Sequence, residues 1–246
     1  MTKLYKKSEI TFAILWIAAY VVLSSLADQL SESLGVVKSV TAALHIVMSL
    51  ILFFWIRNND LGEKYGFCRP IIPAKRFLYY LPLVIIASTA FWGGIKMQYS
   101  FPGAMLYFIS MCCVGFLEEV IFRGLLFKAM EKDGLKSAII VSSLTFGIGH
   151  IVNLFNGSGR VLASSLMQVF FAVMVGFTLV LIFYFSGSLI PCIVFHSANN
   201  ALSAFESTGT MDPKLSMILN IILIIIVLGG YVLYLLKTFR FEPGAR

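Results

Sequence analysis

The chain has 246 residues, of which 59% are hydrophobic and only 13% are charged. Ordinary globular chains are roughly 45–50% apolar and about 25% charged, so this composition excludes a soluble globular protein. The formal net charge is +7, but the basic residues are scattered between apolar runs and form no patch of the kind that binds nucleic acid. We therefore predict a polytopic membrane protein with no nucleic-acid partner.

The apolar runs predict about eight membrane crossings. A spanning helix needs about 20 mostly apolar residues, because each residue rises about 1.5 Å through a hydrocarbon core about 30 Å thick. We expect an all-α transmembrane bundle that forms one integral membrane domain, residues 1–246. The predicted spans are Phe12–Leu26, Val40–Ile56, Phe77–Ile95, Gly103–Phe127, Ser137–Val152, Val161–Phe185, Leu189–Phe205 and Leu215–Leu236.

The basic residues predict how this bundle lies in the membrane. Cytoplasmic loops are enriched in Lys and Arg, and with the N-terminus inside, fourteen of the 19 basic residues fall on the cytoplasmic side. Both termini are therefore expected to be cytoplasmic. The first span ends near Ser25-Leu26-Ala27, which resembles a signal-peptidase site, but we expect a retained anchor. The basic residues expected on the opposite side are Lys38, Lys96, Arg160 and Lys214.

Three charged residues fall inside the fourth predicted span: Glu118, Glu119 and Arg123. Ionisable residues at a helix centre cost roughly 2.5–3.5 kcal/mol each on insertion scales, so they indicate a functional site. Glu119 and Arg123 are four residues apart in the favourable order for a helical ion pair. Glu118 is turned about 100° away from Glu119, so we expect it to be free of that pair and to act as a general base. The alternative is a structural network of all three residues.

Two histidines and an amide are expected at a similar depth. Counting about 1.5 Å per helical residue from the cytoplasmic ends places Glu118, His150 and His196 near one level of the bilayer, and Asn200 follows His196 by one helical turn. Such a set can activate water: Glu118 takes a proton, His150 shares or orients it, and His196 and Asn200 stabilise an oxyanion. His45 is expected to be an ordinary hydrogen-bonded core residue.

The same residues leave the role of a metal open. Glu118, His150 and His196 could together hold Zn²⁺ with one position left for water, or they could act without a metal. The sequence contains no H-E-x-x-H motif, and no aspartate falls within a predicted span. Phosphate-binding glycine motifs are also absent from the sequence, so no nucleotide partner is expected. A serine–histidine dyad stays open on the intramembrane serines, which are Ser142, Ser143, Ser164 and Ser165.

Three short motifs in this half of the chain resemble those of a known family. They match, in order and separation, the motifs of the CPBP intramembrane proteases, also described as Abi or type II CAAX prenyl endopeptidase-like proteins. The similarity covers about residues 103–205, which we take as a protease core. The motifs are Glu118-Glu119-x-x-x-Arg123, Phe146-x-x-x-His150 and His196-x-x-x-Asn200.

The resemblance implies an eight-helix endopeptidase that cuts peptide bonds near the cytoplasmic face. It implies water activation by Glu118 and His150 and oxyanion stabilisation by His196 and Asn200. Members are described both as zinc enzymes and as metal-independent glutamate proteases. Eukaryotic members cut prenylated CAAX proteins, and many bacterial members are linked to bacteriocin immunity. The compact chain favours a multi-pass protein of the bacterial plasma membrane.

The sequence therefore predicts an intramembrane endopeptidase whose partners are membrane lipid and a membrane-embedded or lipidated peptide or protein. The Glu119–Arg123 pair is expected to support the catalytic residues. The first rival is a non-enzymatic bacteriocin-immunity or partner-binding protein, in which the polar cluster only specifies packing. The second rival is an ion-coupled transporter, since buried Glu, Arg and His can form relays, although the chain lacks the internal repeat common in transporters.

Overall fold

The structure, a computed structural model, describes residues 1–154, 162–207 and 212–240. Within these ranges the chain is helical, and an isolated antiparallel bridge joins Ile95 to Glu206. The α-helices are α1 (Thr2–Lys7), α2 (Glu9–Ser33), α3 (Ser39–Asn58), α4 (Leu81–Ser88), α5 (Phe101–Glu118), α6 (Lys128–Glu131), α7 (Leu135–Gly149), α8 (Leu162–Ser186), α9 (Ile190–Leu202), α10 (Pro213–Ile224) and α11 (Gly230–Thr238). The 3₁₀ segments are Ala74–Tyr80, Thr89–Phe91, His150–Leu154 and Ser203–Phe205, and the π-helical segments are Glu119–Phe127 and Ile225–Gly229.

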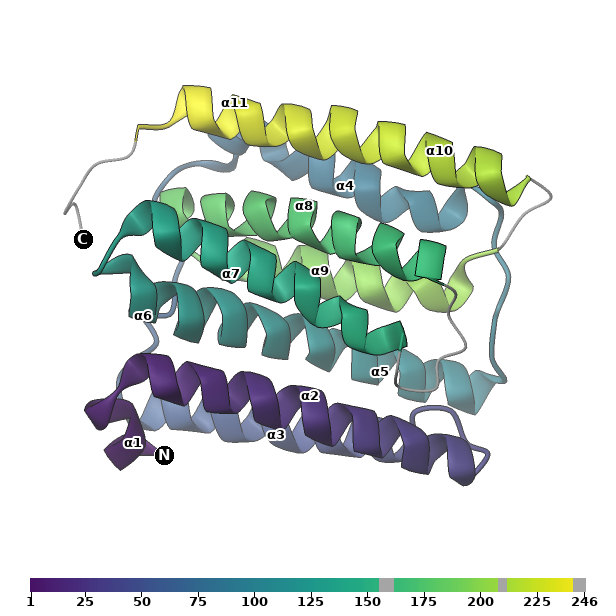
Figure 1. The fold of residues 1–246 in the computed structure, drawn as a ribbon, viewed down its shortest axis with the longest axis horizontal. Helices are drawn as coiled ribbons and strands as arrows, with labels where there is room; N and C mark the ends of the chain where they lie inside the picture. The colour runs from purple at the N-terminus through teal and green to yellow at the C-terminus, as the bar shows by residue number, and fades with distance from the viewer. Residues whose placement is uncertain (155–161, 208–211, 241–246) are drawn as a thin grey trace.

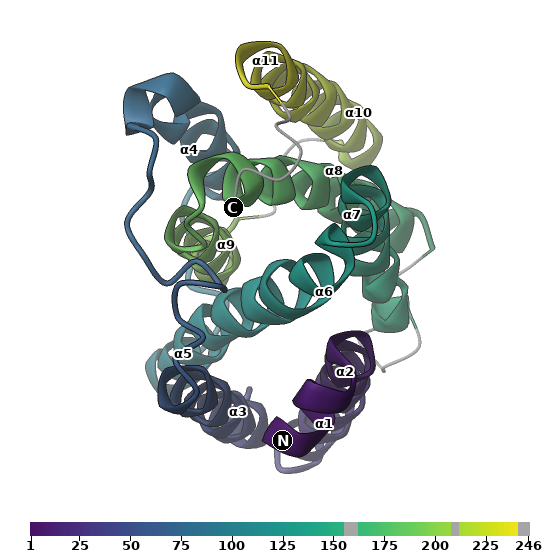
Figure 2. The same cartoon turned by 90° about the vertical axis from the view of Figure 1, so that its left-hand side faces the viewer.

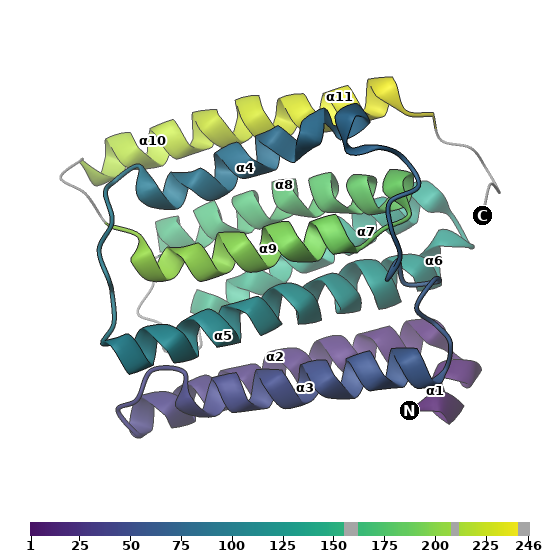
Figure 3. The same cartoon turned by 180° about the vertical axis from the view of Figure 1, so that it is seen from behind.

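The helices run side by side in a bundle (Figure 1). The α2–α3 pair forms one outer layer, and α4 with α10 and α11 lies on the opposite side (Figures 1 and 2). Helices α5, α7, α8 and α9 lie between these layers, and α9 lies beside α5 when the bundle is seen from behind (Figure 3). The predicted all-α polytopic bundle is therefore confirmed.

Within the described ranges, six helical stretches are long and apolar enough to cross a membrane. They are Glu9–Ser33, Ser39–Asn58, Phe101–Glu131, Leu135–Val152, Leu162–Ser186 and Lys214–Thr238. The other two predicted spans are short or interrupted. The third contains left-handed backbone at Leu78, Tyr79 and Tyr80 just before α4, and the seventh changes from α9 to a 3₁₀ turn. The total of eight crossings stays a prediction, and the predicted limit Val161 and the topology residue Arg160 lie outside the described residues.

Helix α2 is longer than the predicted first span and includes Asp28. The predicted first span excluded this residue, whereas the candidate span Glu9–Ser33 includes it. The Lys38 ammonium lies 2.7 Å from Asp28 Oδ1, and the Thr41 hydroxyl donates to the same oxygen at 2.6 Å. These partners compensate the charge of the Asp28 carboxylate near the end of α2.

The rod formed by α5 and α6 passes through a π-helical segment, Glu119–Phe127. All nine residues of this segment are buried. In a π-helix the hydrogen bonds run from i to i+5, and such turns are rare and frequent at functional sites. Glu118 ends the α-helical part and Glu119 begins the π-helical part, so the paired carboxylates lie at a change of helical geometry.

Glycines bring the central helices into backbone contact. A Cβ atom at Gly115 would lie 2.5 Å from the backbone nitrogen of Ser197, and one at Gly147 would lie 2.9 Å from that of Val173. Small residues allow this close approach in membrane bundles, where van der Waals packing and hydrogen bonds drive association. These contacts fix α5 against α9 and α7 against α8, the helices that carry the predicted site.

Candidate active site

The ion pair that the spacing of Glu119 and Arg123 predicts is present in the structure. Arg123 Nη1 lies 3.0 Å from Glu119 Oε1, and both side chains are fully buried. The Arg123 guanidinium also lies over the Phe146 ring, 4.1 Å from its centre, which is a cation–π geometry. A lone buried charge would be costly in these surroundings, and the pairing of Glu119 with Arg123 offsets that cost.

His196 connects the two glutamates. Its Nδ1 atom lies 2.7 Å from Glu119 Oε1, and its Nε2 atom lies 3.4 Å from Glu118 Oε2. With Glu119 ionised and accepting, the hydrogen of this contact is on Nδ1. The sequence predicted the depth of His196 but not this bridge to Glu119.

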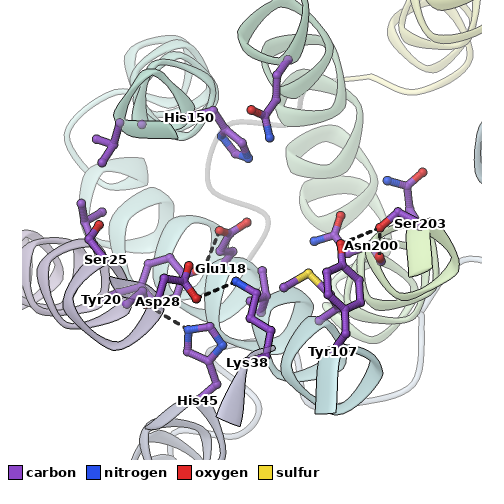
Figure 4. A pocket seen from close by; sticks show the side chains of 18 of the residues that line it. Tyr20, Ser25, Asp28, Lys38, His45, Tyr107, Glu118, His150, Asn200 and Ser203 are labelled. Atoms are coloured by element: carbon purple, nitrogen blue, oxygen red, sulfur yellow. Dashed lines mark hydrogen bonds and ion pairs between the residues drawn. The ribbon is translucent and has the colours of Figure 1, made fainter. Parts of the chain in front are cut away.

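Glu118 has a partner that the sequence did not indicate. The hydroxyl of Tyr20, in α2, donates to Glu118 Oε1 at 2.7 Å (Figure 4). The sequence predicted only that Glu118 would be free of the Glu119–Arg123 pair, and it did not indicate this hydrogen bond. The second oxygen, Oε2, is buried and has no hydrogen-bond partner within the described part of the chain. Tyr20 thus holds Oε1, while Oε2 faces His196 Nε2 at the longer distance of 3.4 Å.

His150 directly follows α7 as its C-cap residue and presents its ring to a cavity (Figure 4). Its Nδ1 atom lies 2.9 Å from the carbonyl oxygen of Phe146. Since a carbonyl can only accept, Nδ1 carries the hydrogen, and the neutral ring keeps its lone pair on Nε2. The turn of helix that precedes His150 therefore sets the tautomer a base needs.

Asn200 lies on α9, one turn after His196, and lines the same cavity as Glu118 and His150 (Figure 4). The hydroxyl of Ser203 donates to the backbone carbonyl of Asn200 at 2.6 Å and lies 2.8 Å from the hydroxyl of Tyr107 on α5. These contacts join the end of α9 to α5 near the Asn200 side chain.

Two cavities connect the predicted site residues. The larger has a volume of about 660 Å³ and is lined by Glu118, His150 and Asn200, among others. The smaller, of about 70 Å³, is lined by His150, His196 and Asn200. His150 and Asn200 therefore stand between the two spaces, and all four predicted catalytic residues border one space or the other.

His45 is hydrogen-bonded through both ring nitrogens, to Ser24 Oγ at 2.9 Å and to Ser110 Oγ at 3.0 Å. It is buried, as expected of a core histidine, and it also lines the large cavity. Two of the serines considered for a serine–histidine dyad have hydroxyls that make no hydrogen bond to a histidine in the described ranges. The hydroxyl of Ser142 donates to the carbonyl of Phe122, and that of Ser143 is buried without a hydrogen-bond partner in the described ranges.

The possible zinc ligands are not gathered into one set. Across the described ranges, no three His, Cys, Asp or Glu side chains lie close enough together to hold a metal ion. Both nitrogens of His196 already face carboxylates, and Nδ1 of His150 faces a carbonyl. This arrangement does not fit a ready-made site of Glu118, His150 and His196. Zinc binding by these residues stays a prediction for metal analysis.

The fold and this cluster define the class: a multi-pass helical membrane protein with a buried acid–histidine site. Residues 100–202 match the family model described as type II CAAX prenyl endopeptidase Rce1-like. No curated protein and no solved structure matches the chain. Over these residues the chain is similar to the type II CAAX prenyl endopeptidases of this model, which supports the resemblance found in the motifs. All the motif residues fall within this range.

Proposed function

We propose that this protein is an intramembrane endopeptidase in which Glu118 and His150 activate a water molecule. One observation carries the proposal: Glu118 Oε2 is buried and without a hydrogen-bond partner among the described residues, while its carboxylate borders a cavity that His150 and Asn200 also line. A carboxylate in this position is suited to accept a proton from water, and the match to the family model supports peptide hydrolysis.

The reaction begins when a water molecule loses a proton to Glu118 Oε2. The oxygen of this water then attacks the carbonyl carbon of the substrate peptide bond. The lone pair on His150 Nε2 accepts a hydrogen bond from the same water and orients it. The carbonyl oxygen becomes an oxyanion. Glu118 then returns the proton to the amide nitrogen, and the carbon–nitrogen bond breaks to give a free carboxyl and a free amine.

Two donors are available for the oxyanion. The amide of Asn200 lines the large cavity, and the His196 ring lines the small cavity together with Asn200. Removing a single donor of this kind typically costs 10²–10³-fold in turnover. Glu119 and Arg123 position His196, because Glu119 Oε1 contacts both the Arg123 guanidinium and His196 Nδ1. They are positioning residues and need not touch the substrate.

The substrate proposed for this reaction is a membrane-embedded or lipidated peptide, with the bacterial plasma membrane as the location. The apolar exterior of the bundle requires lipid, and the buried site can be reached only by a substrate that enters the cavity. A role in bacteriocin immunity would then follow from cleavage of a peptide. The non-enzymatic rival assigns the same role to binding alone.

A glutamine variant separates these two functions. Purified protein in liposomes would be offered a set of membrane peptides, and new termini would be identified by mass spectrometry. We expect Glu118→Gln to lower turnover by about 10²–10⁴-fold, the usual contribution of a general base. Glu131→Gln is the control, because Glu131 lies farther along the same rod and pairs with Lys128.

Equal turnover in wild type and Glu118→Gln would refute the assigned base. If the glutamine variant also kept full biological activity in cells, the binding function would be favoured over the protease. A folded variant without turnover, together with an active Glu131→Gln, supports the enzyme.

A further inference from the structure

The large cavity extends from the site toward only one end of the bundle. Among its lining residues, Phe122 lies farthest along the α5–α6 rod toward α6. At the other extreme the lining includes Lys38 at the start of α3, Tyr99 just before α5 and Glu206 just after the turn that follows α9. These positions lie at the end of the bundle away from α1 and α11 (Figures 1 and 3).

Between the site and the end of the bundle near α1, the interior is filled by buried side chains. Residues of the π-helical segment fill the bundle there: Ile121 and Phe127 are fully buried, and Leu125 is 2% exposed. Ala129 in α6 is also fully buried and extends this packed region. Among the described residues, a peptide therefore has a path to Glu118 from the end that holds Lys38, and side chains block the opposite route.

The open end carries a partly exposed ion pair. The side chains of Asp28 and Lys38 are 32% and 20% exposed, they lie 2.7 Å apart, and both line the cavity (Figure 4). Ser25 lines the cavity one helical turn deeper on α2. Polar and charged groups at a mouth favour water over lipid, so the cavity is expected to be filled with water rather than with acyl chains.

Charge indicates which side of the membrane the mouth faces. Most basic residues lie in segments at the closed end, including Lys64, Arg76, Lys132 and Lys237. Cytoplasmic loops are the ones enriched in Lys and Arg. The closed end is therefore the cytoplasmic one, and the mouth beside the Asp28–Lys38 pair faces the non-cytoplasmic side.

We propose that substrates enter from the non-cytoplasmic side, so that this enzyme cuts peptide segments that have been exported or are exposed on that face. This inference rests on the proposed protease function. It departs from the cytoplasmic-face cleavage that the family resemblance implies. The volume of about 660 Å³ is typical of a pocket for a small ligand, so the cavity accommodates a short stretch of extended chain and not a folded domain.

Thiol labelling of intact cells tests this proposal without any need for turnover. The four native cysteines, Cys68, Cys112, Cys113 and Cys192, are first replaced by alanine. Single cysteines are then introduced as Ser25→Cys in the cavity, Leu26→Cys on the lipid face and Lys132→Cys at the closed end. Leu26 is the matched control, because it neighbours Ser25 at the same depth and is 56% exposed on the outside of the bundle.

A membrane-impermeant maleimide added to intact cells should label Ser25→Cys and spare Leu26→Cys, whose thiol lies in lipid. Lys132→Cys should react only after the cells are permeabilised. If Ser25→Cys reacts only after permeabilisation, or if Lys132→Cys reacts in intact cells, the proposed direction of entry is overturned. Equal labelling of Ser25→Cys and Leu26→Cys would overturn the water-filled path.

The labelling experiment and the turnover assay test the entry side and the protease function independently. Inactive protein whose Ser25→Cys variant reacts from outside would keep the path and remove the protease assignment. Active protein with a protected Ser25→Cys would keep the protease and overturn the entry side.

Discussion

The matched region, residues 100–202, and the α2–α3 pair that precedes it contribute to the same site in different ways. The matched region supplies the residues with reactive groups, Glu118, His150, His196 and Asn200. The α2–α3 pair supplies Tyr20, which bonds Glu118, together with His45 and one wall of the cavity. The motifs thus supply the proposed catalytic residues, while helices outside the motifs shape the cavity beside them.

The largest effect on stability is expected within the matched region, at Arg123. Arg123→Met leaves Glu119 buried without its guanidinium, and breaking a buried pair in this way costs roughly 3–5 kcal/mol. Lys128→Met is the control, since the Lys128–Glu131 pair is partly exposed and such pairs contribute about 0–1 kcal/mol. Thermal unfolding in detergent measures both, and equal melting temperatures would contradict the structural role of Arg123.

The two histidines of the cavity wall test the comparison directly. His150→Ala, in the matched region, should lower turnover by about 10²–10⁴-fold, because it removes a group that acts on the water. His45→Ala, in the preceding pair, should lower stability through its lost bonds to Ser24 and Ser110 and leave a larger residual activity. Turnover per folded molecule separates the two variants, and the reverse order would reject the assignment of His150.

A smaller effect is expected at Tyr20. Tyr20→Phe removes the hydroxyl that positions Glu118 but keeps the ring, so the change costs one hydrogen bond to a charged group, about 1.5–3 kcal/mol. If most of this appears in the transition state, turnover falls by about 10–100-fold. A loss in kcat at unchanged KM is the signature of a positioning residue. Full activity would show that α2 forms only a wall.

The smallest effect is expected from a chelator. Because Glu118, His150 and His196 do not form a gathered ligand set in the described structure, we expect turnover to persist after dialysis against a zinc chelator. Metal analysis of the same sample provides the control. One zinc per chain, with activity lost on chelation and restored by zinc, would show that these three residues rearrange around a metal.

The sequence predicted the parts of this molecule that depend on local rules. Apolar runs gave the helical bundle, and the i, i+4 spacing gave the Glu119–Arg123 pair. The Tyr20–Glu118 bond joins residues 98 positions apart, and a tyrosine in an apolar helix carries no signal of its partner. The same holds for the bridge from His196 to Glu119, 77 positions away. Such contacts depend on how helices dock, which spacing along one helix does not specify.

The π-helical segment Glu119–Phe127 restricts how the chain can change in length. Removing one residue between Glu119 and Arg123 would rotate the following helix about its axis relative to Glu119. The guanidinium would then leave the carboxylate and the Phe146 ring, although every motif residue was still present in the sequence. Insertions and deletions here are therefore expected to be tolerated far less than those in the connections between helices, and the length of this segment is as much a part of the site as its side chains.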